Sequence, residues 1–76
     1  MTKWFPCKRK DFIRKLIKLG FEKPEYGTKH AIARYGSYKQ VIPSNAEFSV
    51  PQLRVLLRQI EEKMERKITI DEWNSL

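Results

Sequence analysis

The stretch GTKHAIARY, at positions 27–35, contains the only histidine of the chain, His30, with Lys29 and Arg34 close to it. Histidine exchanges protons near neutral pH, so an exposed imidazole can act as a general base or a general acid. Cleavage of RNA needs both roles. A base takes the proton of the 2′-hydroxyl, which attacks the adjacent phosphorus, and an acid protonates the departing 5′-oxygen. His30 as acid or base, with Lys29 and Arg34 holding the phosphate charge, would fit this chemistry.

The sequence does not single out a second group for proton transfer beside His30. Three tyrosines are loose candidates for it: Tyr26, Tyr35 and Tyr38. RNA cleavage by an acid and a base requires no metal and no other cofactor, so we expect none.

Two strand registers are possible for this segment, and they give His30 different roles. Side chains alternate along a strand, so His30 shares a face with Ile32 and Arg34, while the two alanines share the other face. If Ala31 and Ala33 face the core, a helix can approach closely and His30 stands on the open face. If Ile32 faces the core, His30 becomes a core-edge residue and Arg34 is buried, which is costly without a partner. We favour the register with the alanines inside.

Positive charge is concentrated in the first half of the chain. Residues 1–40 carry eleven Lys or Arg and three Asp or Glu, 11 − 3 = +8, whereas residues 41–76 carry five against six, 5 − 6 = −1. A strongly basic surface attracts polyanions, and nucleic acid is the commonest polyanion inside a cell. The alternative is a surface whose charge serves solubility alone.

The segment KRKDFIRKLIKLGF, residues 8–21, has the apolar spacing of an amphipathic helix, and Gly20 is a natural stop for it. The expected core stripe is Phe12, Ile13, Leu16, Ile17 and Leu19. The opposite face carries one acid, Asp11, among the cations Lys10, Arg14, Lys15 and Lys18. Like charges four residues apart repel each other, so this face favours a phosphate partner over plain solvation. We expect Lys10, Arg14 and Lys18 to contact the RNA backbone.

Three short extended segments should follow as an antiparallel meander: FEKPEY (21–26), KHAIARY (29–35) and YKQVI (38–42). The next residues, SNAEF, are expected to form a loop. A second helix should begin with a capping box at Ser49 and Gln52, with Pro51 in its first turn, and run on through IEEKMERK. Its apolar stripe is Leu53, Leu56, Leu57, Ile60 and Met64.

A last short helix is predicted after a second capping box, formed by Thr69 and Glu72, with Ile70 and Trp73 packing back onto the core. The order helix-strand-strand-strand-helix, with this C-terminal helix, predicts an α+β fold. Both long helices should cover one face of a three-stranded antiparallel sheet.

The length of 76 residues fits one domain, 1–76, without room for a second. Cys7 is the only cysteine, so no disulfide can form within the chain, and no group of Cys and His has zinc-site spacing. The N-terminal segment lacks the apolar run of a signal peptide, and no stretch approaches about 18 apolar residues. We therefore expect a soluble, cytoplasmic protein without membrane contact.

Four stretches, in this order, resemble the HicA (YcfA-like) family of toxins from type II toxin-antitoxin systems: FIRKLIKLGFE, GTKH, QVIP and SVPQLRVLLRQI. The resemblance covers about residues 8–60 and leaves 61–76 as a C-terminal helical extension. It implies a fold similar to a double-stranded-RNA-binding domain and an mRNA endoribonuclease, or mRNA interferase, activity. It further implies that a HicB-type antitoxin holds the protein inactive by covering the histidine.

In this family the catalytic histidine comes just after a glycine, which would correspond to His30 and Gly27. Gly27 would permit a turn that a side chain disfavours. Lys29 stands where many members have the first of two histidines, so His30 matches the variant with one more residue after the glycine. The histidine that many members carry after the strand-ending proline is absent here, where Ser44 follows Pro43.

Two hypotheses without catalysis remain open. A module that binds double-stranded RNA by shape needs the basic face and no histidine. A domain that binds an acidic protein partner would lack the steep salt dependence of phosphate contacts.

Overall fold

The computed structural model describes residues 3–26 and 30–76. Within these residues, five strands and three helices follow one another: β1 (Cys7–Lys8), α1 (Arg9–Leu19), β2 (Glu25–Tyr26), β3 (Ala31–Tyr35), β4 (Tyr38–Ile42), β5 (Glu47–Phe48), α2 (Val50–Met64) and α3 (Ile70–Ser75). Strands β2, β3 and β4 form an antiparallel three-stranded sheet in that order. The α+β fold with a three-stranded antiparallel sheet is therefore confirmed.

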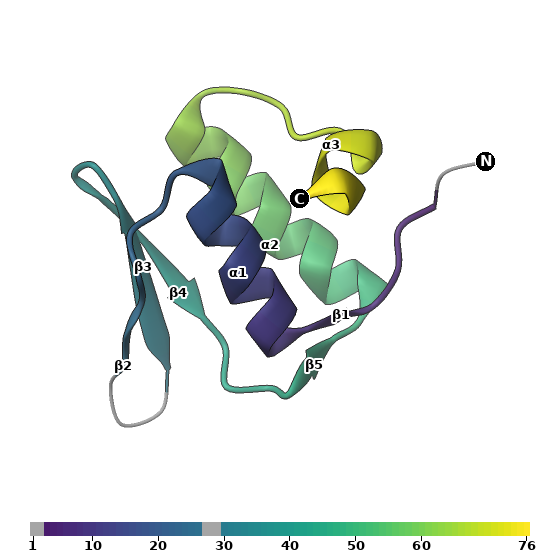
Figure 1. The fold of residues 1–76 in the computed structure, drawn as a ribbon, viewed down its shortest axis with the longest axis horizontal. Coiled ribbons are helices and arrows are strands. Elements are labelled where there is room, and N and C mark those ends of the chain that lie inside the picture. The colour runs from purple at the N-terminus through teal and green to yellow at the C-terminus, as the bar shows by residue number, and fades with distance from the viewer. Residues whose placement is uncertain (1–2, 27–29) are drawn as a thin grey trace.

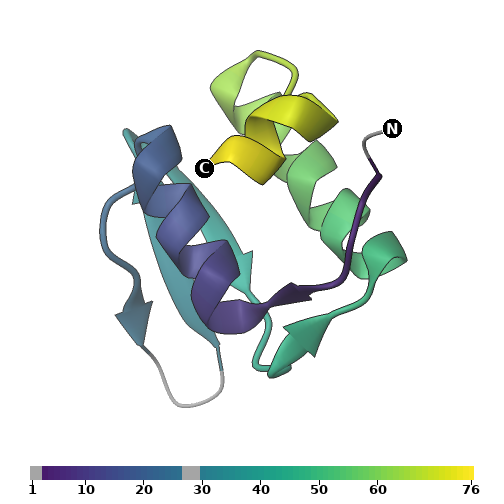
Figure 2. The same cartoon turned by 45° about the vertical axis from the view of Figure 1, so that its right-hand side comes forward.

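The sheet has one covered and one open face. Ala31, Ala33 and Ile42 are fully buried, whereas Val41, on the other face, is half exposed. Helices α1 and α2 lie on the same side of the sheet (Figures 1 and 2). Because alanine side chains are small, the helices can approach this face closely. The expected register, with the alanines inside, is confirmed.

The two long helices follow the predicted apolar stripes, with small differences. In α1, Phe12, Ile13 and Leu16 are buried as predicted. Ile17 was expected in the core stripe, but it is 40% exposed. Helix α2 ends at Met64 and does not run on through IEEKMERK, because Glu65 takes a left-handed conformation with φ 57°. The predicted stripe of α2 is buried from Leu53 to Ile60.

Both capping boxes form only in part. The Ser49 and Thr69 side chains each accept a hydrogen bond from the backbone N–H three residues later, as expected. In a complete capping box, the side chains of Gln52 and Glu72 would bond back to the backbone N–H of Ser49 and Thr69. Instead, the side chain of Gln52 donates to Asn45 and the carboxylate of Glu72 accepts from Arg66.

A second sheet, of two short strands, was not expected from the sequence. Cys7 pairs with Phe48 and Lys8 with Glu47, so the segment SNAEF, expected to be a loop, contains strand β5. The predicted strand FEKPEY is also shorter than expected, because only Glu25–Tyr26 pairs with β3. Pro24, which has no N–H to donate, directly precedes the paired residues.

The core lies between the sheet, α1, α2 and α3. The ring of Phe12 packs edge-on against Phe48, at 5.2 Å between centroids, and against Trp73, at 5.6 Å. Trp73 is buried, so α3 packs onto the core as predicted, while Ile70 is only partly buried. The extension at residues 61–76 therefore completes the same core as the preceding residues.

The polar side chain of Gln40 is buried in this core. Its amide nitrogen donates to Gln59 at 3.0 Å, and its oxygen accepts from the Lys63 ammonium at 2.8 Å. Burial lowers the pKa of Lys63. These bonds satisfy Gln40 and connect β4 to α2, which avoids the cost of an unpaired buried amide.

Candidate nucleic-acid interface

His30 is exposed and lies directly before β3, one residue outside the strand. The first residue of β3, Ala31, pairs with Tyr26 of β2 and with Ile42 of β4. Ala31 and Ile42 are the last pair of β3 and β4 at this end. If the same register is extended by one residue, Pro43 lies opposite His30. The histidine thus occupies the end of the sheet, where its imidazole is accessible to a large substrate.

Arg34 lies on the open face of the sheet, further along β3. One of its guanidinium nitrogens is 3.5 Å from a carboxylate oxygen of Glu25, and the side chains of Arg34 and Glu25 are 40% and 69% exposed. Solvent screens such a pair, so it is weak. Glu25 nevertheless offsets part of the positive charge expected from Arg34.

Two predicted site residues lie outside the described residues. These are Gly27, predicted to form the turn, and Lys29, predicted to hold phosphate. Their positions in the chain put them between β2 and His30.

The three predicted RNA-binding cations of α1 are exposed, but they are spread along the helix. Lys10 lies in the first turn and Lys18 in the last, about 12 Å apart along the axis at 1.5 Å per residue. Arg14, between them, is 3.9 Å from Asp11 and donates to the backbone carbonyl of Leu76 at 3.4 Å. Helix α1 covers the inner face of the sheet (Figure 2), whereas Arg34 alternates with the buried Ala33 and lies on the open face.

Lys15 was expected on this exposed cationic face, but it points towards α3. Its ammonium donates to the backbone carbonyl of Trp73 at 2.9 Å and lies 5.0 Å from the centre of the indole ring. The cation is thus shared between α1 and α3. Helical spacing alone could not show this, because the partner is 58 residues away.

Arg9, which sequence reasoning did not single out, connects α1 to the end of the sheet that carries His30. Its Nε donates to the backbone carbonyl of Pro43 at 2.9 Å, and its guanidinium carbon lies 5.8 Å from the centre of the Tyr26 ring. Tyr26 pairs with Ala31, the residue after His30, and Pro43 follows the strand that pairs with β3. Two contacts therefore hold Arg9 at the end of the sheet where β3 begins, directly after His30.

The three candidate tyrosines lie in different places. Tyr26 is 69% exposed and is at the same end of the sheet as His30. Tyr35 packs its ring against Phe21, with centroids 5.1 Å apart, and Tyr38 pairs with it at the opposite end of β3. Of these three, Tyr26 is therefore nearest to His30 along the sheet, although its pairing with Ala31 puts its side chain on the face that the helices cover.

Cys7 has the setting of a structural thiol. It is buried, its Sγ points to the backbone carbonyl of Lys8 at 3.5 Å, and burial raises the pKa of the thiol. A protonated thiol is a poor nucleophile. Within residues 3–26 and 30–76, no three His, Cys, Asp or Glu side chains gather closely enough to hold a metal ion together.

No helix in the described part of the chain is long and apolar enough to cross a bilayer. Comparison with protein-family models, with curated proteins and with solved structures found no match.

Proposed function

We propose that this protein is a HicA-type toxin of a type II toxin-antitoxin pair and cleaves mRNA with His30 as the catalytic acid or base. The observation that carries the proposal is the setting of His30. It is exposed at one end of the sheet, and the contacts of Arg9 with Pro43 and with the ring of Tyr26, which lie at the same end, support the proposal. Proton transfer and charge stabilisation are the two contributions that this cleavage needs from a protein.

In the proposed reaction, a base removes the proton of a 2′-hydroxyl as its oxygen attacks the neighbouring phosphorus. The bond from phosphorus to the 5′-oxygen breaks, and an acid donates a proton to that oxygen. The products are a 2′,3′-cyclic phosphate and a 5′-hydroxyl. His30 takes one of the two proton-transfer roles, and the exposed Tyr26 is the nearest candidate for the other. Arg9, Lys29 and Arg34 offset charge on the phosphate.

The outer face of α1 extends this interface along the RNA backbone through Lys10, Arg14 and Lys18. A helix lying over a three-stranded antiparallel sheet with an accessible basic side supports a fold similar to a double-stranded-RNA-binding domain. A HicB-type antitoxin would inhibit the enzyme by covering His30. The toxin would cleave its mRNA substrate in the cytoplasm.

The test is cleavage of an end-labelled single-stranded RNA by the purified protein, compared with His30→Ala and His30→Gln. We expect the wild type to release fragments with a 5′-hydroxyl, also in the presence of EDTA. Both variants should lose at least about a hundredfold in rate, the usual contribution of one acid or base. Because His30 is exposed, the variants should keep the circular dichroism spectrum and the RNA affinity of the wild type. Equal cleavage by wild type and both variants would rule out the catalytic role.

A second candidate function, binding of double-stranded RNA without cleavage, is favoured by the position of Lys18. This residue lies at the other end of α1 from Arg9, where it can hold a phosphate but cannot assist His30. An intact RNA duplex that shifts in a gel with wild type and His30→Ala alike, without new fragments, would select this function.

A further inference from the structure

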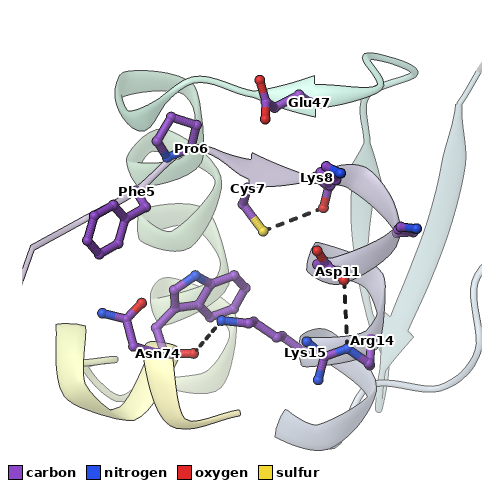
Figure 3. Close-up of a pocket in the computed structure, with 11 residues that line it drawn as sticks. Phe5, Pro6, Cys7, Lys8, Asp11, Arg14, Lys15, Glu47 and Asn74 are labelled. Carbon is purple, nitrogen blue, oxygen red and sulfur yellow. Dashed lines mark hydrogen bonds and ion pairs between the residues drawn. The ribbon is translucent and has the colours of Figure 1, made fainter.

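A cavity of about 540 Å³ opens between the N-terminal segment, the start of α1, β5 and α3 (Figure 3). This volume falls in the range of small-molecule sites, about 300–1,000 Å³. Four cations line it against two acids, Asp11 and Glu47, which gives 4 − 2 = +2. The cations are Lys8, Lys10, Arg14 and Lys15.

Lys15 is the best-placed cation of this cavity. One hydrogen bond to the backbone carbonyl of Trp73 and the contact with the indole ring fix its ammonium group. An ammonium has three N–H donors, so this bond leaves two of them for a ligand. Because the side chain is already held, less conformational entropy is lost when it binds an anion.

An exposed aromatic ring stands across the cavity from the cations of α1. Phe5 is 61% exposed, and it lies on one side while Lys8 and Arg14 lie on the other (Figure 3). Proteins that bind single-stranded nucleic acid combine these two features, because bases stack on aromatic rings while phosphates contact cations. A carboxylate of an acidic peptide would use the cations and leave the ring exposed.

We propose that this cavity binds one nucleotide of single-stranded RNA, with its base stacked on Phe5 and its phosphate on Lys8 and Lys15. The inference rests on the proposed RNA substrate. Lys10 and Arg14 belong both to the cavity and to the outer face of α1, so an RNA strand that follows this face reaches the cavity. The site would therefore hold a nucleotide away from the bond that is cleaved beside His30.

The experiment is a titration of the full chain with adenosine 5′-monophosphate and, separately, with ribose 5-phosphate, which lacks the base. Trp4→Phe leaves Trp73, which lines the cavity, as the only tryptophan, so its fluorescence reports binding. In this background the nucleotide should bind about five-fold or more tightly than the sugar phosphate. Phe5→Leu should abolish that preference, and Lys8→Gln should weaken both probes alike.

The control is Lys67→Gln, which removes the same charge in the connection between α2 and α3 and should leave both affinities unchanged. Equal affinity for the two probes, no binding of either, or an unchanged preference in Phe5→Leu would overturn the inference. A tetraglutamate peptide that binds while the nucleotide does not would also overturn it, in favour of an acidic protein partner. The titration needs no cleavage. If the nucleotide binds as expected but the protein shows no nuclease activity, the proposed function is refuted and the inferred nucleotide site stands.

Discussion

Gly20 ends α1 in a backbone conformation that other residues rarely adopt. Its φ is +117°, and its N–H donates to the carbonyl of Ile17 while the N–H of Phe21 donates to that of Leu16. These bonds satisfy carbonyls that the end of the helix leaves without partners. A Cβ at this position would also lie 3.3 Å from the ring of Tyr35, which is a tight contact.

Replacing Gly20 by Ala should lower the free energy of unfolding by about 2 kcal/mol, since both the backbone and the Tyr35 ring must adjust. Gly36→Ala is the matched control. There φ is +59°, and a Cβ would meet no atom within 4 Å, so only the backbone cost of about 1 kcal/mol applies. Urea unfolding of the two variants measures both values. An equal loss would mean that the contact with Tyr35 relaxes without cost.

At the scale of elements, an ion pair joins the end of α2 to α3. The two terminal nitrogens of Arg66 donate to the two carboxylate oxygens of Glu72, at 2.9 Å and 2.7 Å. The hydrogen bonds from Arg66 are the main reason that the pKa of Glu72 is lowered. This two-point contact adds to the Thr69 cap in holding the first turn of α3.

Glu72→Gln should therefore lower the free energy of unfolding at pH 7 by less than about 1 kcal/mol, because the pair is partly exposed. A lowered pKa means that the pair stabilises the fold above the unfolded pKa, about 4.3 for Glu, and that this contribution is lost as pH falls through the folded value. The difference from wild type should thus shrink towards pH 3 in urea unfolding. Glu22→Gln, an exposed carboxylate after α1, serves as the control. A difference that persists unchanged at pH 3 would contradict the role of the charge.

For the molecule as a whole, Trp73 connects the C-terminal helix α3 to α1. It is buried, contacts the ring of Phe12 and holds the ammonium of Lys15. Small domains bury a limited core, so one large aromatic side chain contributes a considerable share of the stability.

Trp73→Ala should cost roughly 3–5 kcal/mol, as expected for removal of a large buried aromatic side chain. Because small domains are stable by about 5–15 kcal/mol, this variant should be close to unfolding at room temperature. Trp73→Phe keeps most of the apolar contact and should lose less. Thermal unfolding followed by circular dichroism gives the comparison. A Trp73→Ala variant as stable as wild type would show that α3 is not part of the cooperative core.

The sequence by itself determined the three helices, the order of these helices and the three strands of the larger sheet, and the inward face of β3. These follow from local rules: the spacing of apolar residues along a helix, capping residues such as Ser49 and Thr69, and the cost of burying Arg34. It also indicated His30 as the residue with acid-base chemistry.

Only the tertiary structure decided which residues from distant parts of the chain come together. The pairing of β1 with β5, the contact of Arg9 with Tyr26 and Pro43, and the attachment of Lys15 to Trp73 join residues that are far apart in the chain. Such contacts leave no periodic pattern in the sequence, because they depend on how the packed elements approach one another. The cations of α1 were thus predictable as a group, whereas the attachment of Lys15 to Trp73 was not.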